Sequence, residues 1–330
     1  MRKINKVLTA VAVSSALFSI NAQAADVNLA IGFVDPATSS YAMGGQKFAD
    51  ECARLTDGRV QIEVVAGGTL GGEREMVEGA QLGTLDIVTA ANPVFSQFIP
   101  EMVILDQPYL FASPKEAHFA IDGKLGQLIE EKAEQQGMHI LGWLESGFRD
   151  VFSKNEVAKP EDFKGLKIRT MENKMQIAAF NALGAVSTPM PFTEQYTALQ
   201  QGTIDANENA VCNMLINKYY EVIKNVTRTN HQFTYIGVAI SDRAWESIPE
   251  ELRPKVQEAM KIAVEWQRNH LQELNKDSEE QLTTKYGVKF HDIDKNALKE
   301  IILPQVKPLS ASVPQEWIDA INEGIANANK

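Results

Sequence analysis

The chain has 330 residues, 44% of them hydrophobic and 23% charged, which is enough for two globular domains that each contain a sizeable core. Its formal net charge of −11 argues against nucleic acid and anionic membrane surfaces as partners. An anionic ligand would therefore need a locally basic pocket.

The first 24 residues have the form of a secretory signal peptide. A positive segment with Arg2, Lys3 and Lys6 precedes the apolar run Val7 to Ile20, and Ala22-Gln23-Ala24 is a small-x-small cleavage site. The apolar run is short for a bilayer span, so a permanent anchor is the alternative. We expect cleavage after residue 24, export to the periplasm and no membrane insertion of the mature chain.

From Asp26 onward the pattern alternates between strand and helix. We expect a strand at Val27 to Val34, a helix at Tyr41 to Thr56, and strands at Val60 to Val65 and Asp86 to Thr89. Strands joined by helices of this length pair in parallel, and their carboxyl ends carry the binding loops of α/β proteins. The pattern therefore predicts an α/β fold.

Two loops at these strand ends contain candidate ligand contacts. The loop Asp35 to Tyr41 is rich in hydroxyl groups, and Ser39 and Tyr41 are the candidates in it, with helix capping as the alternative role. The loop Ala90 to Pro93 offers Asn92 as a polar contact from the first domain.

The chain is expected to leave the first domain near Gly147. A strand from His139 to Leu144 comes first, and the glycine then accompanies a change of pattern. Arg149 follows at the crossing and is a candidate cation for an anionic ligand. Its alternative is a salt bridge to Asp150 or to another acid.

Arg169 ends a short apolar run that reads as a buried strand. A guanidinium there would point into the crevice where open α/β sheets bind ligands. Its planar fork of donors matches the two oxygens of a carboxylate. The alternative is a structural ion pair. Arg149 lies 20 residues earlier, on what we expect to be an adjacent strand, so both guanidiniums would face one cleft.

Two further candidates follow. After a helix at Asn173 to Leu183 and a strand at Val186 to Met190, a proline fixes the backbone and holds Phe192 near the cleft, with core packing as the alternative. Asn209, before another helix, offers a donor and an acceptor to ligand hydroxyls, with helix capping as the alternative.

The remaining chain suggests how the domains are divided. Tyr235 to Ile240 returns to the first domain, and Glu250 to Tyr286 is a helical pattern long enough to span both. Lys289 to Lys330 completes the second domain. We expect residues 25–146 plus about 235–275 in domain I, and 147–234 plus about 276–330 in domain II.

The sequence gives little support to an enzymatic function. The five histidines show no metal-binding spacing, and no nucleophile motif accompanies a plausible triad, so we expect no catalysis, no metal and no cofactor. A sugar-acid lyase or isomerase is the enzyme to keep as an alternative. Cys52 and Cys212 could form a disulfide after export, but two free buried thiols are at least as likely.

Several segments together resemble the solute-binding proteins of TRAP transporters, the tripartite ATP-independent periplasmic family. The resemblance covers nearly all of the mature chain, in the family's order. It is carried by LGGEREMVEGAQLGTLDIV (Leu70 to Val88), PYLF (Pro108 to Phe111), WLESGFRDVFSKN (Trp143 to Asn155), GLKIRT (Gly165 to Thr170), PMPFTEQYTALQQGTIDANEN (Pro189 to Asn209) and SIPEELRPKVQEA (Ser247 to Ala259).

The resemblance implies a two-domain periplasmic-binding-protein (Venus-flytrap) fold with a long helix bracing both domains. It also implies roles for site residues: Arg169 would hold a ligand carboxylate, Arg149 would be a second ligand-binding arginine, Asn209 would lie near them and Phe192 would pack against the ligand. Such a protein captures an organic acid between its domains and delivers it to membrane permease subunits.

The ligand is a finer expectation. The motifs look closest to relatives that bind sugar acids of the hexuronate, aldonate or diketogulonate type. A C4-dicarboxylate is the alternative, and it would call for a further cation on the first-domain side. Arg74, Lys115 and Lys124 are the candidates for that cation.

Overall fold

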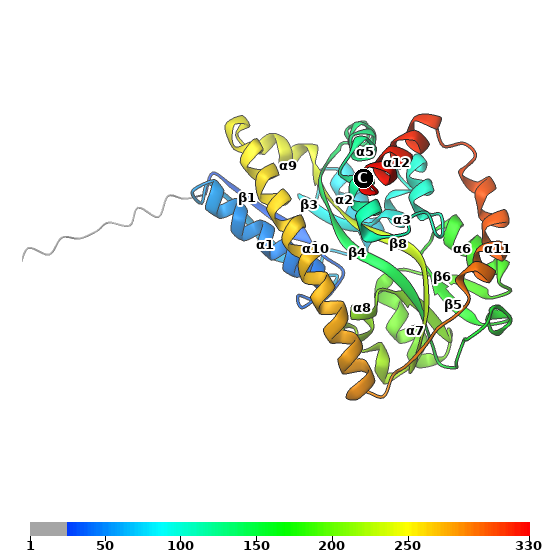
Figure 1. The fold of residues 1–330 in the computed structure, drawn as a ribbon. Coiled ribbons are helices and arrows are strands. Elements are labelled where there is room, and N and C mark those ends of the chain that lie inside the picture. The colour runs from blue at the N-terminus through cyan, green and yellow to red at the C-terminus, as the bar shows by residue number, and fades with distance from the viewer. Residues whose placement is uncertain (1–24) are drawn as a thin grey trace, which may run out of the picture.

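The computed structural model describes residues 25–330 (Figure 1), so the expected signal peptide lies outside the described residues. The strands are β1 (Val27–Gly32), β2 (Val60–Val65), β3 (Ile87–Ala91), β4 (Met138–Ser153), β5 (Lys167–Thr170), β6 (Val186–Pro189), β7 (Ala206–Asn209), β8 (Asn225–Ser241) and β9 (Lys289–His291). The helices are α1 (Ser40–Leu55), α2 (Glu73–Gln81), α3 (Asn92–Phe95), α4 (Pro114–Ile121), α5 (Lys124–Glu134), α6 (Lys174–Ala182), α7 (Gln195–Gln201), α8 (Val211–Ile216), α9 (Asp242–Ser247), α10 (Arg253–Thr284), α11 (Lys295–Val306) and α12 (Gln315–Ala328).

The strands form one mixed sheet in the order β2-β1-β3-β8-β4-β7-β5-β6, with β9 on β8. We call β2, β1 and β3 with their helices the first half, and β7, β5 and β6 with theirs the second half. β1 is parallel to β2 and β3, while β5 is parallel to β6 and β7. The expected α/β fold with parallel strands joined by helices is confirmed.

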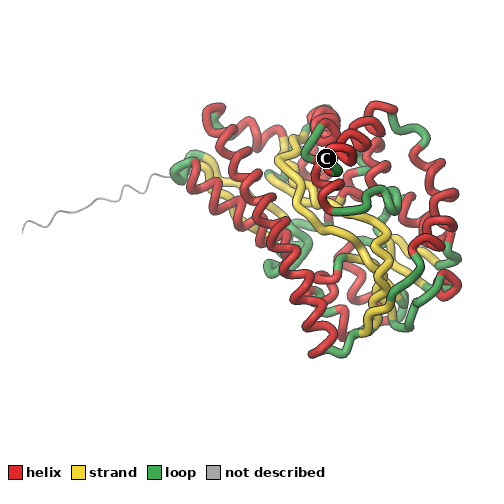
Figure 2. The backbone as a smooth tube through the Cα atoms, viewed as in Figure 1, coloured by secondary structure: helices red, strands yellow, loops and turns green. Residues whose placement is uncertain are grey.

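Two long antiparallel strands, β4 and β8, join the halves (Figure 2). β8 is almost wholly buried, and β4 is buried from Trp143 onward except at Phe148. The expected strand at His139 to Leu144 is only the start of β4. The strand continues past Gly147, where the pairing shifts register and φ is +85°, a backbone angle that glycine adopts without strain.

Helix α10 spans both halves, as expected for the brace. It has 32 residues and packs against α1 of the first half, the long strand β4, and α8 of the second half (Figure 1). Val256, Met260, Ala263 and Leu271 are among the buried positions on its inner side, with the spacing of three to four residues that places side chains on one face.

The C-terminal helix departs from the expected division of the chain. α12 packs against α4 and α5, both in the range expected for domain I, whereas the sequence placed residues 276–330 in domain II. The contact is close: a Cβ at Gly324 would lie 2.3 Å from the Cα of Ala120. The rest of the division stays a prediction.

Two further expectations concern membranes and thiols. In residues 25–330 we find no helix with the length and apolar character that crossing a bilayer requires. Cys52 and Cys212 are both buried and both free.

Candidate functional site

The order of the strands determines where Arg149 and Arg169 lie relative to each other. Strand β7 lies between β4, which carries Arg149, and β5, which carries Arg169, so the expectation that the arginines sit on adjacent strands is wrong. The interposed strand brings Glu208 and Asn209 between them, because β4 pairs with β7 from Asp150 opposite Asn209 onward. The site is therefore built on three strands.

A small cavity of about 30 Å³ lies where the two halves face each other. The polar residues that line it from the first half and its flanking helices are Asp35, Tyr41 and Glu73, and those from β4 and the second half include Arg149, Arg169 and Asn209. A second cavity of about 30 Å³ shares Glu73, Arg169, Met171 and Phe192 with it and adds Arg74. In the first cavity the acidic groups Asp35 and Glu73 lie on one wall and the arginines on the other, whereas the second cavity has Arg74 beside Glu73.

Arg169 is buried without an acidic partner. Its side chain donates from Nε and Nη2 to the backbone oxygen of Met190, at 3.0 and 2.8 Å, and Nη1 donates to no residue that the structure describes. No carboxylate of residues 25–330 lies within ion-pair distance of it, so the alternative of a structural ion pair is not what the structure shows. Burial, and the nearby Arg149, lower the pKa of Arg169. Burying an unpaired charge is costly, and charge-assisted hydrogen bonds to an anion offset this cost.

Arg149, in contrast, forms an ion pair with an acidic residue. Its Nε and Nη2 bind the carboxylate of Glu208, and Nη1 donates to Asn209 Oδ1 at 3.1 Å. Burial raises the pKa of Glu208, but Arg149 and His231 outweigh it and lower that pKa from 4.5 to about 2. The alternative of a salt bridge, considered for Arg149, is therefore observed. Arg149 is held rigidly at the cavity wall and its charge is largely offset by Glu208.

Asn209 and Tyr41 are linked through Asn213, and Tyr41 makes the contact between the two halves. Asn209 Oδ1 accepts from the Ala210 amide, from Arg149 and from Asn213, whereas Nδ2 of Asn209 has no acceptor among residues 25–330 and remains available to a ligand. The alternative of helix capping by Asn209 is not observed, since α8 begins with no side-chain cap. The hydroxyl of Tyr41 donates to Ser146 and accepts from Nδ2 of Asn213, both at 2.8 Å. This last hydrogen bond joins the first half to the second.

Two carboxyl groups of the cavity were not among the expected site residues. Burial and the neighbouring Glu73 raise the pKa of Asp35 from 3.8 to about 8. Burial also raises the pKa of Glu73, whose Oε1 accepts from the Ala91 amide at 2.8 Å. Position in the sequence could have indicated both, because Asp35 opens the hydroxyl-rich loop and Glu73 begins the helix after the glycine-rich turn.

Three other expected site residues have mixed outcomes. Phe192 lines both cavities and also packs against the hydrophobic core, so the alternative of core packing is observed and its contact with a ligand stays a prediction. Ser39 is the N-cap of α1 and accepts from the Ala42 amide at 3.1 Å, and it does not line either cavity. Asn92 is buried and also does not line them, because α3 begins there and turns the side chain inward. It donates to Asp106 and accepts from the Tyr235 amide.

Glu208 was also missed, although it decides the electrostatics of the site. The stretch ANEN around it has neither the alternation nor the β-branched residues of a strand. Only the tertiary pairing with β4 and β5 makes it one, and this pairing places Glu208 against Arg149.

Comparisons with known proteins assign the family. The family model "Bacterial extracellular solute-binding protein, family 7" (DctP) matches residues 31–312. The chain is similar to the 2,3-diketo-L-gulonate-binding periplasmic protein YiaO of Escherichia coli (strain K12), with 32% identity over 93% of this chain and 95% of the relative. It is also similar to the C4-dicarboxylate-binding periplasmic protein DctP of Rhodobacter capsulatus, with 27% identity over 98% of each chain.

A solved structure agrees. The TRAP periplasmic solute-binding protein of Xanthobacter autotrophicus Py2, with bound β-D-galacturonate, superimposes with a TM-score of 0.85 at 28% identity, over 90% of this chain and 99% of that one. The family consists of transport proteins that bind solutes, and not of enzymes, which removes the lyase or isomerase alternative. The chain belongs to the DctP family of extracellular solute-binding proteins and is a solute-binding protein of the TRAP type.

Proposed function

We propose that this protein captures a sugar acid of the hexuronate, aldonate or diketogulonate type between its two halves. The observation that carries the proposal is Arg169, a buried guanidinium with free donors and no acidic partner among residues 25–330. A ligand carboxylate bound there gains a charge-assisted pair, and Nδ2 of Asn209 and Nη1 of Arg149 lie on the same cavity wall.

The opposite wall supports a ligand with hydroxyl groups rather than a second carboxylate. Asp35 and Glu73 line the cavity there, and their oxygens accept hydrogen bonds from ligand hydroxyls, whereas a second ligand carboxylate would find no cation among the residues that line this wall of the cavity. A sugar acid combines one carboxylate with several hydroxyls. The relatives that bind diketogulonate and galacturonate support the same class.

A C4-dicarboxylate is the second candidate, and Arg74 is the observation that favours it. Arg74 lines the neighbouring cavity, although it also pairs with Glu78 at 3.0 Å on the surface. Lys115 and Lys124, the other cations considered, do not line either cavity. Because the relative DctP is a C4-dicarboxylate-binding protein, the ligand test includes dicarboxylates.

The closed arrangement of the cleft is part of the proposal. In this structure the cavity is too small for a hexuronate, and the bond between Tyr41 and Asn213 ties the halves together. The ligand therefore enters when the halves separate, and closure over it produces the form that we propose the membrane permease subunits of the transporter recognise. We also propose that residues 1–24 are removed on export, so that Ala25 is the mature N-terminus in the periplasm. Mass spectrometry of the protein recovered from the periplasm of a Gram-negative host tests this.

The ligand class is tested by a thermal-shift plate of residues 25–330 against D-galacturonate, D-glucuronate, D-galactonate, 2,3-diketo-L-gulonate, succinate and malate. A ligand that binds only the folded state raises the midpoint by mass action. The proposal predicts that at least one sugar acid raises it and that the dicarboxylates do not. A shift with dicarboxylates alone moves the assignment to the second candidate, and no shift with any acid contradicts carboxylate capture.

A further inference from the structure

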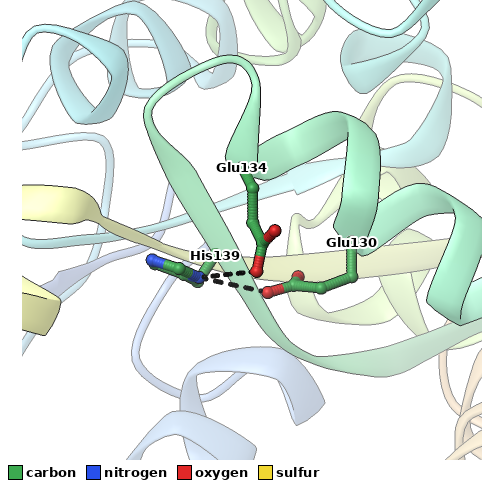
Figure 3. A group of neighbouring side chains, drawn as sticks. All are labelled: Glu130, Glu134 and His139. Atoms are coloured by element: carbon green, nitrogen blue, oxygen red, sulfur yellow. Dashed lines mark hydrogen bonds and ion pairs between the residues drawn. The ribbon is translucent and has the colours of Figure 1, made fainter.

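A cluster of metal-binding side chains lies outside the cleft, on the surface of the first half (Figure 3). Glu130 and Glu134 are one turn apart on α5, and His139 follows at the start of β4 after a tight turn. Nδ1 of His139 lies 3.2 Å from Oε1 of Glu130 and 3.7 Å from Oε1 of Glu134, and all three atoms fall within 4.8 Å of one another. None of these residues lines either cavity of the cleft.

The spacing of these atoms suits a metal ion. Bonds of 2.0 to 2.2 Å from Zn²⁺ to nitrogen and oxygen ligands place two ligands of a tetrahedron about 3.3 to 3.6 Å apart. The two measured distances from His139 bracket this value, and the two glutamate oxygens need to approach each other only by rotation of flexible side chains. All three side chains are partly exposed, which leaves an entry path and room for a water or another ligand at the fourth position.

The surroundings hold the ligands in the orientation that a metal needs. Oε2 of Glu130 accepts from the Ile140 amide at 2.5 Å, so that Oε1 is turned toward the histidine. Nε2 of His139 lies 3.3 Å from Asp242 at the start of α9. A carboxylate beside the outer nitrogen favours the tautomer with the proton on Nε2 and leaves the lone pair of Nδ1 free for the metal, as in many histidine sites for zinc.

We propose that Glu130, Glu134 and His139 form a binding site for a divalent transition-metal ion, with Zn²⁺ as the ion that best fits one imidazole and two carboxylates. The hard ions Ca²⁺ and Mg²⁺ prefer oxygen ligands only and do not suit the imidazole. A bound ion would tie α5 to β4, with Asp242 of α9 behind the histidine, and would stabilise the first half without touching the ligand cleft.

The test is titration of Zn²⁺ into the untagged, chelator-treated protein by isothermal calorimetry, with Co²⁺ absorption as a spectroscopic readout. We expect one ion per chain, with a tetrahedral Co²⁺ spectrum. His139→Ala should lose this binding, and Asp242→Ala should keep it with about 10- to 100-fold lower affinity. His291→Ala is the matched control, because His291 is another partly buried histidine, 3.5 Å from the single acid Glu156, and its loss should change nothing.

Stability gives a second readout that does not depend on the calorimetry. Zn²⁺ should raise the melting midpoint of the wild type and of His291→Ala, but not that of His139→Ala. If His139→Ala proves poorly folded, Glu134→Gln replaces it and should weaken binding at least tenfold. Equal Zn²⁺ binding by the wild type and the His139→Ala or Glu134→Gln variant, or no saturable binding by the wild type, would overturn the proposal.

Discussion

Replacing Glu208 by glutamine should destabilise the protein far more than an ordinary loss of a surface ion pair. Glu208 is fully buried, and its carboxylate binds Nε and Nη2 of Arg149. Glutamine keeps the shape but leaves the guanidinium without its counter-charge in a buried place, which typically costs about 3 to 5 kcal/mol. The lowering of the pKa of Glu208 from 4.5 to about 2 has the matching sign, since the native state favours the charged carboxylate.

The sign of the pH dependence follows from the lowered pKa. The stabilisation is complete above pH 4.5 and is lost as the pH falls from 4.5 to about 2, because Glu208 is then protonated in the native state as well. Urea unfolding at pH 7 should therefore show the full difference between the wild type and Glu208→Gln. At pH 3 the difference should be smaller.

A matched control is available elsewhere in the chain. Glu279 pairs with Arg228 on the surface, where both side chains are about a third or more exposed, and Glu279→Gln should cost less than about 1 kcal/mol. If Glu208→Gln destabilises the protein no more than Glu279→Gln does, the description of a buried, charge-compensating pair behind the site is wrong.

Three further changes follow from the contacts in the cleft. Tyr41→Phe removes the hydroxyl that accepts from Asn213 across the halves and should weaken ligand binding by up to about tenfold, with unchanged stoichiometry by calorimetry. Asp35→Asn removes a group whose pKa is raised from 3.8 to about 8. As the pH rises through that range, the unfolded chain loses its proton before the native state does, so the wild type loses stability. The variant should therefore be more stable than the wild type at pH 8 by at least about 1 kcal/mol in urea unfolding, with the gain shrinking toward pH 4; equal stability at pH 8 would refute the buried carboxyl. Glu73→Gln removes a carboxyl oxygen that can accept from a ligand hydroxyl and that offers nothing to a second carboxylate, so the ratio of affinities for D-galacturonate over succinate should fall at least about tenfold in competition calorimetry, and an unchanged ratio would contradict this role.

The sequence indicated the class of fold and the residues that resemble the family's binding arginines, because strand and helix periodicity and local motifs are short-range properties. It did not indicate what surrounds those arginines. Strand β7 consists of polar residues without a strand pattern, and only its pairing with β4 and β5 brings Glu208 between the two arginines. Long-range register of this kind cannot be read from local spacing.

Asn92 and Ser39 show a related limit. Both stand in loops at the carboxyl ends of strands, where α/β proteins place binding residues, and the sequence alone could not tell which way each side chain turns. The start of a helix decided both cases: Ser39 caps α1, and Asn92 turns inward to Asp106 as α3 begins. Asp35, in the same loop as Ser39, and Glu73, the first residue of α2, line the cavity instead.

The measurement that tests the central claim most directly is calorimetric titration of D-galacturonate, or of whichever sugar acid stabilises the protein most, into the wild type and Arg169→Lys. Lysine keeps the charge but loses the fork, so affinity should fall well over tenfold while the unliganded melting midpoint stays close to that of the wild type. Arg54→Lys, at an exposed surface pair with Glu51, controls for the substitution itself and should bind normally. If Arg169→Lys binds the acid as tightly as the wild type, Arg169 does not hold the ligand carboxylate and the account of the site is wrong.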